Sequence, residues 1–356
     1  MTVAAAPLTR RVALAPAFAG CAAAAFAGCA AVALVVALRA PLATTVLGLI
    51  GFGVLHNVLE LRYVAGRFAG VLSGRLLWLL AVLVTGIVAC RLLVLRTPEI
   101  LLAYGVLAAG VLFAGRAVVS RLAGLAGLGV ALTASLSWPA YHFVVLAHLH
   151  NVVPLVFLWE WSRRLRVGRT AFRAVQVGWV LAVPALVLAG VFDRLITAGP
   201  STVVAFAGTP AAVAGPVTPP AVTVGLRFLV VFAFLQTMHY VVWVGFLPRY
   251  APDATAAFEA RVPWLRGWRP WVLAGAAAAV LAVLFVSDDA QGRTLYAAFA
   301  SYHAYLEFPV LLALLFAQRE DRSLRGPQSQ ASDTAQREDR SLRGPQSQAS
   351  DTARRQ

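Results

Sequence analysis

The hydrophobic pattern of this chain consists of long apolar runs separated by short polar segments that are rich in arginine. A helix needs about 20 predominantly apolar residues to cross a bilayer. Ten candidate runs lie at 12–38, 41–62, 76–95, 98–118, 121–138, 139–161, 171–192, 221–247, 269–287 and 294–317. The pattern therefore predicts an all-α, multi-pass transmembrane helical bundle of about ten spans.

Every second connection between the apolar runs is rich in arginine. They cluster before the first run and after the second, fourth, sixth, eighth and tenth, and the other connections carry few charges. Positive residues favour the cytoplasmic side, so both termini are expected in the cytoplasm. Arg91 and Arg96 are exceptions at the predicted outer end of the third span. All 30 basic residues are Arg, which we interpret as the codon bias of a bacterial genome, with the bacterial inner membrane as the expected location.

The last part of the chain has a different composition. Gln318–Ala335 recurs without change as Gln336–Ala353, in an 18-residue tandem repeat. Such a polar, arginine-rich segment cannot bury a core. We therefore predict two parts, a transmembrane domain over 1–317 and a disordered cytoplasmic tail over 318–356.

Composition agrees with the apolar pattern. The chain is 60% hydrophobic and 13% charged, with a mean hydropathy of +0.77, whereas soluble domains carry about 25% charged residues. These values exclude an ordinary soluble enzyme and a disordered protein. The net charge of +15 lies between the spans, so the expected partner is the lipid bilayer and not a nucleic acid. The three cysteines match no disulfide framework or zinc motif.

Two glutamates, Glu60 and Glu307, lie within or close to predicted spans, where an ionisable group usually has a partner or a function. Each follows a histidine by four residues, in His56-x-x-x-Glu60 and His303-x-x-x-Glu307. Residues four apart share one face of a helix. All six histidines of the chain lie in predicted spans, which indicates a polar centre inside the membrane.

The spans that carry most of these histidines run in the same direction, so the rings can meet at a similar depth. Helical bundles build metal sites in this way. His148 and His150 are about 200° apart around a helix, so one compact site takes one of them, and we favour His150. His148 joins from another angle if Pro154 distorts its helix. His142 is a weaker candidate near the outer end.

The predicted metal ligands are His56, His148, His150, His239 and His303. Glu60 and Glu307 are the candidate catalytic groups, either as further ligands or as groups that orient a histidine. Imidazole binds iron, copper, zinc and nickel. Three alternatives remain open at this point: a b-type haem protein that carries electrons, a proton-coupled transporter that uses the His–Glu pairs, and purely structural polar contacts.

The order of these motifs resembles that of the bacterial Brp/Blh-type β-carotene dioxygenases. Segment 56–60, His-Asn-Val-Leu-Glu, is similar to the His-Gly-x-x-Asp element of that family, with Asn for Gly and Glu for Asp. His142-Phe143 is similar to the start of its His-Phe-Gly element, whose role could also lie at His148 or His150. Segment 239–243, His-Tyr-Val-Val-Trp, resembles a later element, although Leu235 stands where the family has a second histidine. His303 and Glu307 match its final His and acidic residue.

The resemblance implies a multi-pass membrane enzyme with a histidine-ligated, non-haem iron. It also implies a dioxygenase reaction that consumes O₂ and cleaves a carotenoid. From these features we expect an iron-dependent oxidoreductase, an oxygenase whose lipophilic small-molecule substrate enters from the bilayer.

Overall fold

The ten predicted spans are all present in the computed structural model, which describes residues 16–115, 117–197 and 202–314. The predicted tail at 318–356 lies outside the described residues. The helices long and apolar enough to cross a membrane are Gly20–Arg39, Pro41–Arg67, Gly74–Leu92, Arg96–Ala114, Val118–Ser137, Pro139–Arg164, Arg169–Leu188, Gly225–Tyr250, Arg269–Ser287 and Asp289–Leu314. The protein is thus an all-α, multi-pass helical bundle.

Several spans are built from more than one helical element. The uninterrupted ones are α1 (Pro16–Arg39), α2 (Pro41–Arg67), α3 (Gly74–Leu92), α4 (Arg96–Ala114), α5 (Val118–Ser137), α15 (Arg269–Ser287) and the C-terminal helix (Asp289–Leu314). The sixth span comprises α6 (Pro139–Val152), α7 (Pro154–Trp161) and the 3-10 turn η1 (Ser162–Arg164). The seventh comprises α8 (Arg169–Val177), the π-helix η2 (Gly178–Ala182) and α9 (Val183–Leu188). The eighth comprises α12 (Gly225–Tyr240), the π-helix η5 (Val241–Phe246) and α13 (Leu247–Tyr250).

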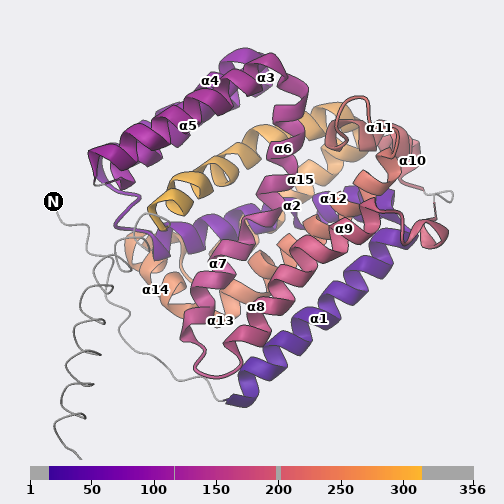
Figure 1. The fold of residues 1–356 in the computed structure, drawn as a ribbon, viewed down its shortest axis with the longest axis horizontal. Helices are drawn as coiled ribbons and strands as arrows, with labels where there is room; N and C mark the ends of the chain where they lie inside the picture. The colour runs from indigo at the N-terminus through magenta and orange to yellow at the C-terminus, as the bar shows by residue number, and fades with distance from the viewer. Residues whose placement is uncertain (1–15, 116, 198–201, 315–356) are drawn as a thin grey trace, which may run out of the picture.

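Short elements connect the spans. They are η3 (Asp193–Leu195), α10 (Val204–Ala207), α11 (Pro210–Ala214), η4 (Gly215–Val217), α14 (Pro252–Arg261) and η6 (Pro263–Leu265). Among the described residues no strand is present. In Figure 1, α3, α4 and α5 lie on one side of the bundle and α1 lies on the other. The helices α2, α6 and α12 lie between these two sides, and His56 on α2 and His239 on α12 are buried.

One of the interruptions has a clear physical cause. Pro154 has no N–H to donate, so α6 ends at Val152 and α7 begins at Pro154. In the eighth span, α12 gives way to the π-helix η5 directly after His239 and Tyr240. Such π-helical turns are frequent at functional sites because they redirect the side chains that follow.

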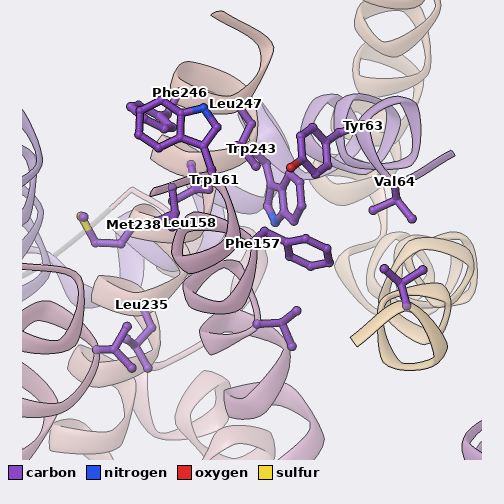
Figure 2. Close-up of a cluster of buried hydrophobic side chains, with 14 of the residues drawn as sticks. Tyr63, Val64, Phe157, Leu158, Trp161, Leu235, Met238, Trp243, Phe246 and Leu247 are labelled. Carbon is purple, nitrogen blue, oxygen red and sulfur yellow. The ribbon is translucent and has the colours of Figure 1, made fainter. Parts of the chain in front are cut away.

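A cluster of aromatic side chains packs between α2, α7 and η5 (Figure 2). The Trp243 ring lies 5.6 Å from the Tyr63 ring and 5.2 Å from the Phe157 ring, centroid to centroid. Trp243, Phe157 and the neighbouring Trp161 are fully buried. Close packing of this kind fixes the relative positions of the three helices and leaves little room for water.

Ion pairs join neighbouring segments at the arginine-rich end of the bundle. Arg67 pairs with Glu160, and Arg164 forms a two-pronged pair with Asp253. At the opposite end, Arg91 binds Glu99 at 2.6 Å and donates to the Ala297 carbonyl at 2.8 Å. Arg91, one of the two arginines that disagree with the simple charge pattern, is thus neutralised by a carboxylate.

Glu259 gives a pH-dependent contribution at the arginine-rich end. The Gly267 N–H and the Arg62 guanidinium both donate to its carboxylate, and they hold its pKa below the ordinary value of 4.5. A carboxylate whose pKa is lower in the folded state stabilises the fold at pH values above its ordinary pKa. This stabilisation is lost as the pH falls through the folded-state pKa. We expect Glu259→Gln to lower stability by about 1 kcal/mol at neutral pH.

The test is the thermal midpoint of the wild type and of Glu259→Gln across a pH series. The difference between the two proteins should shrink as the pH falls from about 4.5 through the lower folded-state pKa, because the wild-type carboxylate takes up its proton over that range. A difference that stays constant down to pH 3 would show that the ionised carboxylate contributes nothing.

Candidate metal centre

Four histidines from four different helices meet in the middle of the bundle. His56 is on α2, His150 on α6, His239 on α12 and His303 on the C-terminal helix. One ligand atom from each lies within 4.8 Å of the others. His56, His239 and His303 are at most 2% exposed. We call these four residues the histidine cluster.

Three of the rings point their Nε2 atoms at one another. His303 Nε2 lies 3.2 Å from His56 Nε2 and 3.1 Å from His150 Nε2. The His239 ring completes the group, with its centroid 4.6 Å from that of His150 and 5.0 Å from that of His56. The histidine cluster is therefore centred on His303, which is the last of the four histidines in sequence order.

The outward-facing nitrogens of two rings are held by acceptors. His56 Nδ1 lies 3.1 Å from the Phe52 carbonyl oxygen, and His150 Nδ1 lies 2.9 Å from Glu307 Oε2. Each Nδ1–H can donate there, which leaves the lone pair of Nε2 directed into the histidine cluster. Partners of this kind fix the tautomer and orientation of metal-binding histidines.

Both predicted glutamates reach the site. Glu60 and Glu307 are fully buried, and Glu60 Oε2 is 3.6 Å from His239 Nε2. Both oxygens of Glu60, Oε1 of Glu307 and both ring nitrogens of His239 have no hydrogen-bond partner in the part of the chain that the structure describes. Buried polar atoms without partners are costly and require an explanation.

A metal ion explains these atoms together. Ligands that bind one ion at about 2.1 Å stand about 3.0–3.4 Å apart in octahedral or tetrahedral geometry, and the two Nε2 separations at His303 are 3.1 and 3.2 Å. The inward Nε2 lone pairs repel one another unless a cation or a proton lies between them. The residues present thus fit a bound transition metal, for which imidazole and carboxylate are ordinary ligands.

Two histidines lie outside the histidine cluster. His148, one of the predicted ligands, directs Nε2 at the Val217 carbonyl, 2.8 Å away. Pro154 does not bring it to the site, because His148 lies within α6, which ends before that proline, and keeps the helical angle that separates it from His150. His142 lies 3.0 Å from the Ser135 hydroxyl. The structure therefore brings together four of the five predicted ligands and both glutamates.

Of two further contacts of the site, one carries no sequence signal and the other carries only its position beside a histidine. The Phe52 carbonyl orients His56, but every residue has a carbonyl. The Tyr240 ring lies 4.8 Å from the His56 ring, and its hydroxyl accepts a hydrogen bond from Gln236 Nε2 at 2.7 Å. The position of Tyr240 directly after His239 is the one sequence feature that could have indicated it.

The Glu307–His150 contact makes a specific prediction. Replacing Glu307 by Gln keeps the size of the side chain and removes its negative charge, so the His150 ring loses a charge-assisted partner. Loss of such an orienting group typically costs 10–100-fold in metal affinity. We expect Glu307→Gln to weaken binding of a divalent metal by about this factor, measured by competition with a chelator of known affinity.

The matched control is Glu99→Gln, which removes a buried carboxylate from the Arg91 pair at one end of the bundle. This variant should retain wild-type metal affinity. Equal losses in both variants would indicate a general effect of buried charge and would contradict the role of Glu307.

The fold and the histidine cluster together define a polytopic helical membrane protein with an intramembrane site that could hold a metal ion. In comparisons with known proteins, no family model, no curated protein and no solved structure matches this chain.

Proposed function

We propose that this protein is a membrane metalloenzyme of the bacterial inner membrane, a non-haem iron oxygenase that acts on a lipophilic substrate. The observation that carries the proposal is the convergence of four imidazoles and two carboxylates at one buried point. His303 Nε2 is at its centre, 3.1 and 3.2 Å from two other ring nitrogens.

Charge balance favours a divalent cation. Two ionised carboxylates in the bilayer interior carry a charge of −2, which is costly to bury without compensation. Glu60 and Glu307 are fully buried, and each lies close to a ring of the histidine cluster. A divalent ion bound by neutral imidazoles makes the group electrically neutral overall.

The geometry favours a free ion over haem. In a haem the porphyrin supplies four nitrogen ligands to the iron, so the protein adds at most two axial ligands. Here the rings of four histidines lie close together, with centroid separations of 4.6–5.0 Å for four of the pairs and 6.4 Å between His56 and His150. This spacing suits a single metal ion in direct contact with the protein.

The donor set suits iron and oxygen chemistry. Histidine and carboxylate ligands with open positions are typical of non-haem iron oxygenases, and the resemblance to the carotenoid-cleaving family adds the same expectation. Iron, when bound, would supply the activation of O₂. The residues of this chain would hold and orient the metal, and the ionised Glu60 carboxylate, which has no hydrogen-bond partner among the described residues, is positioned to accept a proton beside it.

The surroundings support a lipophilic substrate. The histidine cluster lies in the middle of membrane-spanning helices, and Trp243 of the aromatic cluster is 6.3 Å from the His239 ring. Apolar walls exclude water from the reacting centre. A substrate that reaches this depth from the bilayer must itself dissolve in lipid, as a carotenoid does.

The test is metal analysis with an absorption spectrum on detergent-purified protein, followed by oxygen uptake with β-carotene. We expect near-stoichiometric iron, no Soret band, and oxygen uptake that depends on both iron and the polyene. A Soret band would indicate a haem protein and contradict the proposal. If protein purified without chelators holds neither metal nor haem, this would also contradict the proposal. The proton-coupled transporter would then be the favoured alternative.

A further inference from the structure

A groove runs along the outside of the seventh span, away from the histidine cluster. Its volume is about 600 Å³, and its lining residues are Trp159, Thr170, Arg173, Ala174, Val177, Gly178, Leu181 and Ala182. From Thr170 to Ala182 a helix rises roughly 18 Å, which is close to half the thickness of the hydrocarbon core. The groove therefore has the length of about one leaflet.

The two ends of the groove differ in chemistry. Val177, Gly178, Leu181 and Ala182 form an apolar end that lies toward the middle of the span. The other end holds Arg173, whose guanidinium carbon stacks 4.3 Å above the Trp159 ring. Tryptophan belongs at the boundary between the acyl chains and the headgroups, so the charged end lies at headgroup level.

Arg173 is held in a fixed orientation. Its Nε donates to the Ser162 hydroxyl at 2.8 Å, and one terminal nitrogen, Nη2, donates to the Trp159 carbonyl at 3.2 Å. The other terminal nitrogen, Nη1, has no hydrogen-bond partner among the residues that the structure describes. A guanidinium fixed in this way is prepared to bind a phosphate oxygen.

Positive charge around Arg173 is not compensated by nearby carboxylates. Arg163 and Arg169 are close enough to repel it electrostatically. The acidic groups of this region are engaged elsewhere, since Glu160 binds Arg67 and Asp253 binds Arg164. The groove thus offers an uncompensated cationic end and an apolar end, separated by about the length of one acyl chain.

We infer that this groove binds an anionic phospholipid, with the headgroup phosphate at Arg173 and one acyl chain along Val177, Gly178 and Leu181. Basic pockets at the headgroup level of transmembrane helices recognise acidic lipids in this way. The site is distinct from the histidine cluster and does not depend on the function proposed for it. The lipid would join α7 to α8 at the sharp connection between the sixth and seventh spans.

The test is native mass spectrometry of the full-length, detergent-purified protein titrated with phosphatidylglycerol or with phosphatidylcholine of the same acyl chains. We expect phosphatidylglycerol to bind more tightly, and Arg173→Gln to weaken it about fivefold. Arg75→Gln is the matched control, because Arg75 is an exposed arginine on α3 away from the groove; it should leave binding unchanged.

A second variant tests the apolar end and does not disturb Arg173. A Cβ atom added at Gly178 meets no other atom within 4 Å, so the position faces open space, into which Gly178→Leu extends a larger apolar side chain. It should weaken binding of both lipids. Equal effects of Arg173→Gln and Arg75→Gln, or unchanged binding in Gly178→Leu, would overturn the inference. Competition by inorganic phosphate as effective as that by the lipid would show an anion site only and would also overturn it.

Discussion

Replacing His303 by alanine is expected to remove the metal from the protein. His303 Nε2 lies within 3.2 Å of the Nε2 atoms of both His56 and His150, so its loss opens the centre of the histidine cluster. Removal of a group that only orients a ligand already costs 10–100-fold in affinity, so loss of a central ligand should cost about 100-fold or more. Metal content of the purified variant should fall below about a tenth of the wild-type value.

The matched control is His148→Ala. His148 lies two residues from His150 on the same helix, yet its ring is bound to the Val217 carbonyl. This variant removes an imidazole at a similar depth and should retain full metal content, because His148 does not reach the histidine cluster. Full metal content in a folded His303→Ala protein, or equal losses in both variants, would contradict the assignment of the site.

Gly66→Ala is expected to destabilise the protein strongly. Gly66 lies on α2 against α14, and a Cβ atom at this position would overlap the Ala254 carbonyl oxygen. Because that oxygen belongs to the backbone, the two helices must separate. Overpacking of this kind costs up to about 3 kcal/mol, and occasionally more. The wild type and the variant should differ clearly in reversible unfolding by denaturant or in the thermal midpoint.

Gly51→Ala provides the control on the same helix. A Cβ at Gly51 meets no atom within 4 Å, and alanine favours a helix over glycine by up to about 1 kcal/mol. Gly51→Ala should therefore be neutral or slightly stabilising. If the two variants have the same stability, the close approach of α2 and α14 does not restrict the side chain at position 66.

The fold could be predicted from the sequence because one physical quantity determines it. Apolar runs of bilayer length define the ten spans directly, and all ten are helices in the structure. The interruptions within the spans were harder to predict from the sequence. A proline marks the break at Pro154, whereas nothing in segment 241–246 distinguishes a π-helix from an α-helix.

The candidate site was predictable to a similar degree. The rarity of ionisable groups in the spans indicated Glu60, Glu307 and the histidines, and the helical angle between His148 and His150 showed that one compact site takes only one of them. Which of the two it takes depends on the rotation of α6 against its neighbours. That rotation is a property of packing, which no local pattern records. The orientation of the termini, the disordered tail and the identity of the metal stay predictions.

The position of His303 on the C-terminal helix has a consequence for the order of biosynthesis. His56 and His303 are 247 residues apart in the chain, and a ribosome delivers the first of them long before the last. The early spans can enter the bilayer one after another, but the centre cannot close until Asp289–Leu314 has inserted. Completion of the histidine cluster is therefore a late event in the maturation of this protein, and a chain that ends before this helix lacks both His303 and Glu307 however well its other helices assemble.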